Sequence, residues 1–143
     1  MCKKKIIMVL DAQGGGLGKQ LISMIKKTQP DVHLIAVGTN TAATGAMLKA
    51  GADEAVTGEN AARVVSRKAD IIIGPVGMVI ADAMLGEITP MIALSIAQSD
   101  AKRIMIPFNS CDNYIAGVSD FSTGHLIADA VNRLKRYLTE EIL

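Results

Sequence analysis

Hydrophobic residues occur in short, nearly continuous runs that alternate with longer segments of helical periodicity. Such runs are typical of parallel strands covered on both faces, and the alternation predicts an α/β fold. The expected strands are residues 6–10, 32–37, 55–56, 70–73 and 103–107, with 114–118 as a short sixth strand at an edge. The expected helices include residues 16–28, 77–85, 90–98 and 122–139. Two more are expected between the second and fourth strands: one is capped within 39–41 and reaches 49, and the other opens at 58–60 and ends near 68.

This order of elements predicts one doubly wound, mostly parallel sheet of five or six strands. Right-handed crossovers favour the strand order 3-2-1-4-5, with helices on both faces, which is a Rossmann-like arrangement. The length of 143 residues suits a single domain over 1–143. Ligands of such sheets bind beyond the carboxyl ends of the strands, where the strand order reverses. That rule selects residues 11–18, 38–40, 74–77 and 109–113.

A glycine-rich loop follows the first expected strand and leads into the first helix. Backbone N–H groups without neighbouring Cβ atoms can converge on a phosphate, and the positive end of the helix dipole favours the same anion. A plainer reading is a tight turn whose glycines only let the helix pack on the sheet. The residues expected to hold phosphate are Gln13, Gly14, Gly15, Gly16, Leu17, Gly18 and Lys19.

The loop matches no single nucleotide fingerprint. A dinucleotide pattern G-x-G-x-x-G can begin at Gly14 and Gly16 but meets Lys19 in place of the third glycine. The phosphate loop of ATPases would need a glycine at Gln13 and a hydroxyl at Gln20, so an ATPase is disfavoured.

The end of the second strand leaves the choice between NAD and NADP open. Dinucleotide sites place an acid there for the ribose, or an Arg for a 2′-phosphate, and neither is present. Hydroxyl and amide groups at that position offer hydrogen bonds to a ribose instead. The residues expected to complete the cleft are Gly38, Thr39, Asn40, Gly74, Pro75 and Gly77.

Catalytic candidates are few. Asp11 is either an Asx-turn acceptor for the loop or a carboxylate that holds a ribose or an ion. Asn109 and Cys111 follow the fifth strand, but no pattern pairs Cys111 with a base. His33 and His125 are expected to be structural or surface residues. No Cys/His cluster has metal-ligand spacing, so no metal site is expected.

Composition narrows the classes of partner. A net charge of +1, 3% aromatic residues and no Trp disfavour nucleic acid, and the scarcity of aromatic residues ranks flavin low. Two cysteines and no secretory signal favour the cytoplasm. The uncharged runs 71–81 and 88–99 are too short to span a membrane. The weakly charged segment 77–98 suggests a homodimer or larger homo-oligomer.

Several motifs together resemble a family of small uncharacterised bacterial proteins, a domain of unknown function. The resemblance covers most of the chain and implies a Rossmann-like protein, without implying a reaction. The matching segments are residues 11–19, 38–40, 47–53, 57–61 and 73–75.

The sequence therefore predicts a protein that binds a phosphate-bearing nucleotide, such as NAD(P), or another phosphate-bearing small molecule. Its length provides no second domain for a dehydrogenase substrate, so enzymatic activity stays open. One alternative is a non-catalytic nucleotide-sensing or oligomeric interaction module. Another is a small-molecule lyase or transferase that uses Asp11 and Asn109.

Overall fold

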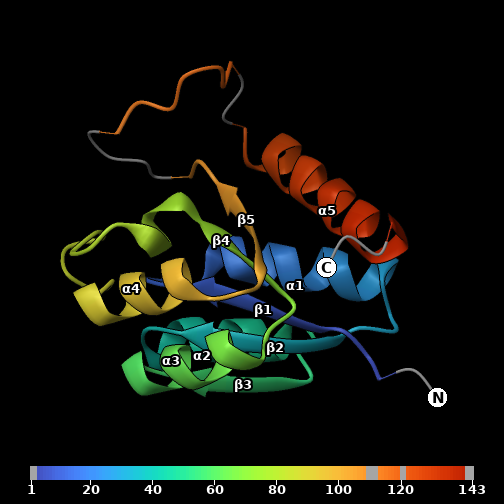
Figure 1. The fold of residues 1–143 in the computed structure, drawn as a ribbon, viewed down its shortest axis with the longest axis horizontal. Coiled ribbons are helices and arrows are strands. Elements are labelled where there is room, and N and C mark those ends of the chain that lie inside the picture. The colour runs from blue at the N-terminus through green and yellow to red at the C-terminus, as the bar shows by residue number, and fades with distance from the viewer. Residues whose placement is uncertain (1–2, 109–112, 120–121, 141–143) are drawn as a thin grey trace.

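The computed structural model describes residues 3–108, 113–119 and 122–140. Its centre is one sheet of five parallel strands in the order β3-β2-β1-β4-β5, as the sequence predicts (Figure 1). The strands are β1 (Ile6–Asp11), β2 (His33–Gly38), β3 (Glu54–Thr57), β4 (Ile71–Pro75) and β5 (Lys102–Ile106).

Helices cover both faces of the sheet. On one face α1 lies between α2 and α5, and on the other α3 packs against α4 (Figure 1). The helices are α1 (Gly16–Thr28), α2 (Thr41–Lys49), α3 (Glu59–Lys68), the 3₁₀ turn η1 (Val76–Val79), α4 (Pro90–Gln98) and α5 (Thr123–Glu140). The bounds of α1 and α4 are those that the sequence predicts.

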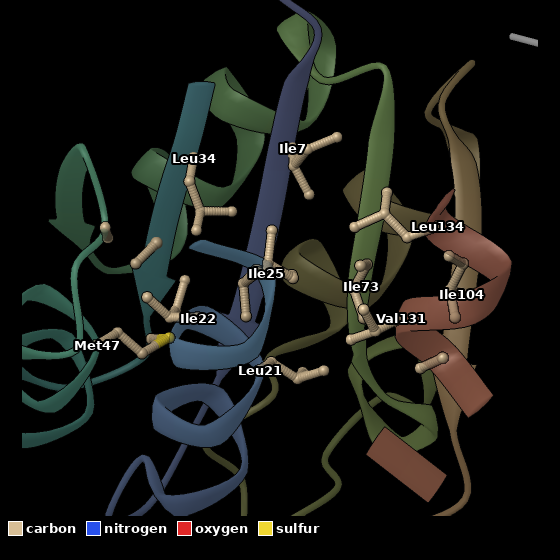
Figure 2. Close-up of a cluster of buried hydrophobic side chains, with 14 of the residues drawn as sticks. Ile7, Leu21, Ile22, Ile25, Leu34, Met47, Ile73, Ile104, Val131 and Leu134 are labelled. Carbon is tan, nitrogen blue, oxygen red and sulfur yellow. The ribbon is translucent and has the colours of Figure 1, made fainter. Parts of the chain in front are cut away.

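The central strand β1 is buried on both faces. Ile7 and Val9 join the cluster beneath α1, α2 and α5, whereas Met8 and Leu10 join the cluster beneath α3 and α4; all four are fully buried. Figure 2 shows the first cluster, in which side chains of α1, α2 and α5 pack against side chains of β1, β2, β4 and β5. Burying each side chain contributes roughly 1.5–3 kcal/mol. The continuous apolar run of β1 therefore has a physical reason.

The strand register brings the carboxyl ends of β1 and β2 together. Asp11 lies opposite Gly38 at the end of the parallel ladder. The next amide, Thr39 N, donates a hydrogen bond to the Asp11 carbonyl at 3.1 Å. The connections after β1 and β2 consequently meet at one edge of the sheet.

The expected sixth strand is wrong. Residues 114–118 form no ladder with the sheet and contain a turn, in which Gly117 has a φ of +88°. Tyr114 is 86% exposed, so its side chain supplies no burial to hold an edge strand. A short apolar segment needs a packed partner to stay extended.

The expected helix at 77–85 is also wrong. The chain forms only η1 and then a series of turns, in which Asp82, Met84 and Leu85 have positive φ values of 66°, 58° and 56°. The segment satisfies its backbone internally, for example from Asp82 N to Ile88 O at 2.7 Å. Ile88 is fully buried in the core, so tertiary packing overrides the helix propensity of the segment.

Strand β4 extends beyond residue 73, the expected end of the strand, through Gly74 and Pro75. Gly74 lies opposite Met105 and Pro75 opposite Ile106, which extends the ladder with β5. Pro75 is the last residue of β4, so the N–H group that it lacks leaves the hydrogen bonds of the strand interior intact.

Candidate functional site

The loop between β1 and α1 is a tight turn held in an unusual backbone conformation. Gly15 N donates to Ala12 O at 3.1 Å, and Gln13, inside this turn, has a φ of 52°. Left-handed backbone is unfavourable for a residue with a Cβ by roughly 1–2 kcal/mol. Gln13 is therefore a strained residue whose conformation the surrounding contacts enforce.

Asp11 anchors the loop from below. Its Oδ1 accepts a hydrogen bond from Ala12 N at 2.8 Å, and its Oδ2 accepts one from Gly18 N, in the first turn of α1, at 2.7 Å. Burial raises the pKa of the Asp11 carboxyl above its ordinary value, although the two amide hydrogen bonds act in the opposite direction. The nearby Glu87 carboxylate adds to the rise. These contacts match the Asx-type organising role among the two roles expected for Asp11.

The four glycines of the loop divide into two pairs. A Cβ on Gly15 would lie 2.8 Å from the Ala43 Cα, and a Cβ on Gly18 would lie 2.6 Å from the Met47 Sδ. Gly15 also has a φ of +75°. These two glycines are required by packing against α2, as the plainer reading proposed.

Gly14 and Gly16 have no such structural requirement. A Cβ on either would meet nothing within 4 Å, and neither has a left-handed φ. Both residues are exposed. Since glycine in an ordered segment reduces stability relative to alanine, its presence here without steric need suits a backbone that a ligand approaches closely.

Some of the loop amides already have acceptors, and others are open. Within the part of the chain that the structure describes, the amides of Gly14, Gly16 and Leu17 have no hydrogen-bond acceptor. They border a pocket of about 190 Å³. The pocket is lined by Asp11, Ala12, Gln13, Gly14, Gly15, Gly16, Leu17, Gln20, Met84, Phe108 and Thr123.

Glu87 reaches the same edge from the connection between β4 and α4. Its Oε2 accepts a hydrogen bond from Gln13 N at 2.8 Å. Its Oε1 accepts from Asn40 Nδ2 at 2.7 Å and from Thr39 Oγ1 at 3.2 Å. One carboxylate therefore joins the connections that follow β1 and β2.

Asn40 ties three elements together. Its Oδ1 caps α2 by accepting from Ala43 N at 2.9 Å, which confirms the expected helix cap. Its Nδ2 donates to both Gln13 O, at 2.9 Å, and Glu87. Thr39 and Asn40 thus lie at the expected edge, with their polar groups directed at a side chain of the same chain.

Other expected binding residues lie away from the pocket. Gly74, Pro75 and Gly77 are buried, and a Cβ on Gly74 would come within 2.7 Å of the Leu10 carbonyl oxygen. Gly38 is buried against Thr44 of α2, where a Cβ would lie 2.3 Å from Oγ1.

Lys19 also lies outside the glycine-loop pocket. It lines a separate hollow between α1 and α2. That hollow is bordered by Lys19, Thr41, Ala42, Gly45, Ala46 and Lys49.

The remaining chemical candidates add little to the site. Asn109 and Cys111 lie outside the described residues. His33 lies at the amino end of β2, where its Nε2 is 2.5 Å from Glu54 Oε2. His125 is in the first turn of α5. No three His, Cys, Asp or Glu side chains gather into a metal-binding group within residues 3–108, 113–119 and 122–140.

A larger hollow, about 1030 Å³, lies at a different place. It is bordered by Lys3, Lys4 and Lys5 before β1 and by residues 28–32 between α1 and β2. These segments lie at the amino ends of the strands, whereas ligands of such sheets bind at the carboxyl ends. Size alone does not make this hollow a better candidate than the smaller pocket, which is bordered by residues with open amides.

Sequence reasoning missed Glu87. Its only sequence signal is that Glu87 and Asp82 are the two charged residues of the otherwise uncharged segment 77–98. A lone acid in an apolar connection at the ligand-binding edge of a sheet merits attention, because burial of a carboxylate without partners is unfavourable. Because residues 77–85 were expected to form a helix, Glu87 was not included among the expected site residues.

Comparison with known families supports the resemblance seen in the sequence. Residues 6–139 match a family described as Domain of unknown function (DUF3842). The chain belongs to this family. The comparison with curated proteins gives no significant match. Among the described helices, none combines the length and hydropathy needed to cross a membrane.

Proposed function

We propose that the chain binds a phosphate-bearing nucleotide at the loop between β1 and α1. The observation that carries this proposal is the pair Gly14 and Gly16, which are glycines without a steric reason and have unpartnered amides beside a pocket. Together with Leu17 N they provide three donors at the amino end of α1. A phosphate oxygen there gains both hydrogen bonds and the favourable end of the helix dipole.

The size of the pocket limits how the ligand is bound. A volume of about 190 Å³ is below the roughly 300–1,000 Å³ that is usual for small-molecule sites. The pocket therefore suits a phosphate group, and the rest of a nucleotide would lie over the exposed side of the loop. NAD and NADP are the first ligands to test, because the fold places phosphate at this switch point in dinucleotide-binding proteins.

The residues of this site have binding and positioning roles in the proposal. The Asp11 carboxylate already accepts two backbone hydrogen bonds, so it organises the loop and is not assigned as a general base. An enzyme would require a further acid or nucleophile at the edge of the sheet.

A sensing module is the second candidate, and one observation favours it. The segment that carries Glu87 to the loop also exposes the whole side chain of Leu85. A ligand that changes the position of this segment would alter an apolar surface. The homo-oligomer expected through residues 77–98 would respond to such a change, because this surface would form its contact.

The experiment compares ligand-induced stabilisation in the wild type with that in Gly14→Ala and Gly16→Ala. A ligand at 100 times its Kd raises the free energy of unfolding by about 2.7 kcal/mol. NAD, NADP and inorganic phosphate are tested by thermal unfolding at constant ionic strength. We expect stabilisation of the wild type and at least about tenfold weaker binding by Gly16→Ala, because a methyl group would occupy the open space over the loop.

The substituted residues border open space, so both variants should fold normally. The proposal is wrong if none of these ligands stabilises the wild type. It is also wrong if both alanine variants bind with unchanged affinity.

A further inference from the structure

The Glu87 carboxylate lies where three donors from two connections converge. Gln13 N belongs to the glycine loop, and the Thr39 hydroxyl and Asn40 amide follow β2. The three hydrogen bonds measure 2.8, 3.2 and 2.7 Å. They fix both oxygens of the carboxylate at the edge of the sheet.

The carboxylate retains the capacity to accept from a ligand. A carboxylate offers about four acceptor directions, and Glu87 uses three of them. Oε2 carries one hydrogen bond and has a free direction. The longest bond, from the Thr39 hydroxyl, is the easiest to replace because that hydroxyl can rotate. Glu87, which is only half-buried, can therefore accept from two neighbouring hydroxyl groups.

The position of Glu87 relative to the loop is that of a ribose partner. Gln13 both borders the pocket and donates its amide to Glu87, so the carboxylate is hydrogen-bonded to the residue that precedes the open amide of Gly14. Dinucleotide sites place an acid at the end of the second strand to hold the ribose hydroxyls. Here Thr39 and Asn40 occupy that position and hold an acid that arrives from the connection after β4.

We propose that Glu87 binds the ribose hydroxyls of the nucleotide and selects a ribose with a free 2′-hydroxyl, that is, NAD over NADP. This inference rests on the proposed function. A 2′-phosphate would bring negative charge against the carboxylate, and the described residues that border the pocket include no Lys or Arg to offset it. Glu87 thus supplies the acid that the end of β2 lacks.

The experiment measures binding of NAD, NADP and inorganic phosphate to the wild type, Glu87→Gln and Asp82→Asn. We expect the wild type to bind NAD at least about tenfold more tightly than NADP. In Glu87→Gln, affinity for NAD should fall about tenfold and the preference over NADP should narrow.

Two features separate loss of recognition from loss of the loop. Inorganic phosphate should stabilise Glu87→Gln at least as much as the wild type, because the amides of Gly14, Gly16 and Leu17 do not depend on the ribose and the variant removes a nearby negative charge. Asp82→Asn removes the same charge from an exposed position of the same segment. It should keep both dinucleotide affinities.

Four results would overturn the inference. Tighter binding of both dinucleotides by Glu87→Gln would show that Glu87 blocks the site. If phosphate binds but Glu87→Gln keeps the wild-type ratio of NAD to NADP affinity, Glu87 has no ribose role. If phosphate binds and neither dinucleotide does, the ribose role is also excluded, while the phosphate-binding loop is retained. Failure of the wild type to bind any of the three would remove the proposed function as well.

Discussion

The connections that follow β1 and β4 leave neighbouring strands at the same edge of the sheet, yet they are built by different means. The first is short, and its conformation follows from glycines at defined positions, from one left-handed residue, Gln13, and from the buried Asp11 beneath it. The second, residues 76–89, has left-handed backbone at Asp82, Met84 and Leu85, where no glycine eases the strain.

This difference shows how two parts of one site are encoded. The first connection offers backbone amides, and the glycine-rich sequence indicates them directly. The second offers a carboxylate, Glu87, whose position depends on strained backbone and on the burial of Ile88. The proposed phosphate contact can thus be recognised in the local sequence, whereas the residue that would decide the proposed specificity cannot.

The largest expected effect separates the two kinds of glycine within the first connection. Gly15→Ala should destabilise the protein by about 2–5 kcal/mol, from left-handed strain and from overpacking against the Ala43 backbone. Gly14→Ala is the matched control one residue away. It should be neutral or stabilising by up to about 1 kcal/mol. Urea unfolding measures both, and equal effects would break the distinction.

An intermediate effect is expected at Asp11. Asp11→Asn leaves one acceptor for the two amides of Ala12 and Gly18, so the free energy of unfolding should fall by about 1–3 kcal/mol. This change tests whether the first connection depends on its buried anchor as well as on its glycines.

The pH dependence of the Asp11→Asn effect carries a definite sign. Because the pKa of Asp11 is raised in the folded state, protonation stabilises the native protein below the ordinary value of 3.8. This contribution is lost as the pH rises through the raised pKa. Unfolding of wild type and variant between about pH 3 and 7 should therefore show the largest difference at the acid end. A difference that grows with pH would contradict the raised pKa.

The smallest effect is expected in the second connection. Leu85 has a φ of 56° and a fully exposed side chain, so Leu85→Asn should be stabilising by up to about 1 kcal/mol, since asparagine tolerates left-handed backbone. Leu94→Asn, at a partly exposed position of α4, should be destabilising by about 0.5 kcal/mol. Thermal unfolding compares the two variants.

Leu85→Asn also tests the expected homo-oligomer. Sedimentation should show weaker self-association of this variant if residues 77–98 form the contact. A monomeric wild type at micromolar concentration would contradict that expectation. A marked loss of stability in Leu85→Asn would instead show that the Leu85 side chain is not free of packing.

The sequence alone predicted the strand order and placed most elements to within two residues, because burial on both faces produces continuous apolar runs such as that of β1. It also located the glycine loop and the cap at Asn40, since both depend on neighbouring residues. It failed at 77–85 and 114–118, where local propensity disagrees with packing.

Only the tertiary structure decided which glycines face open space and which face α2. It alone placed Glu87 against Gln13 and Asn40, which precede it by 74 and 47 residues. Hydrophobic periodicity and turn chemistry are set by nearby residues and can be recognised along the chain. The meeting of distant polar groups depends on strand register, on strained backbone and on a buried neighbour, and those conditions exist only after the chain has folded.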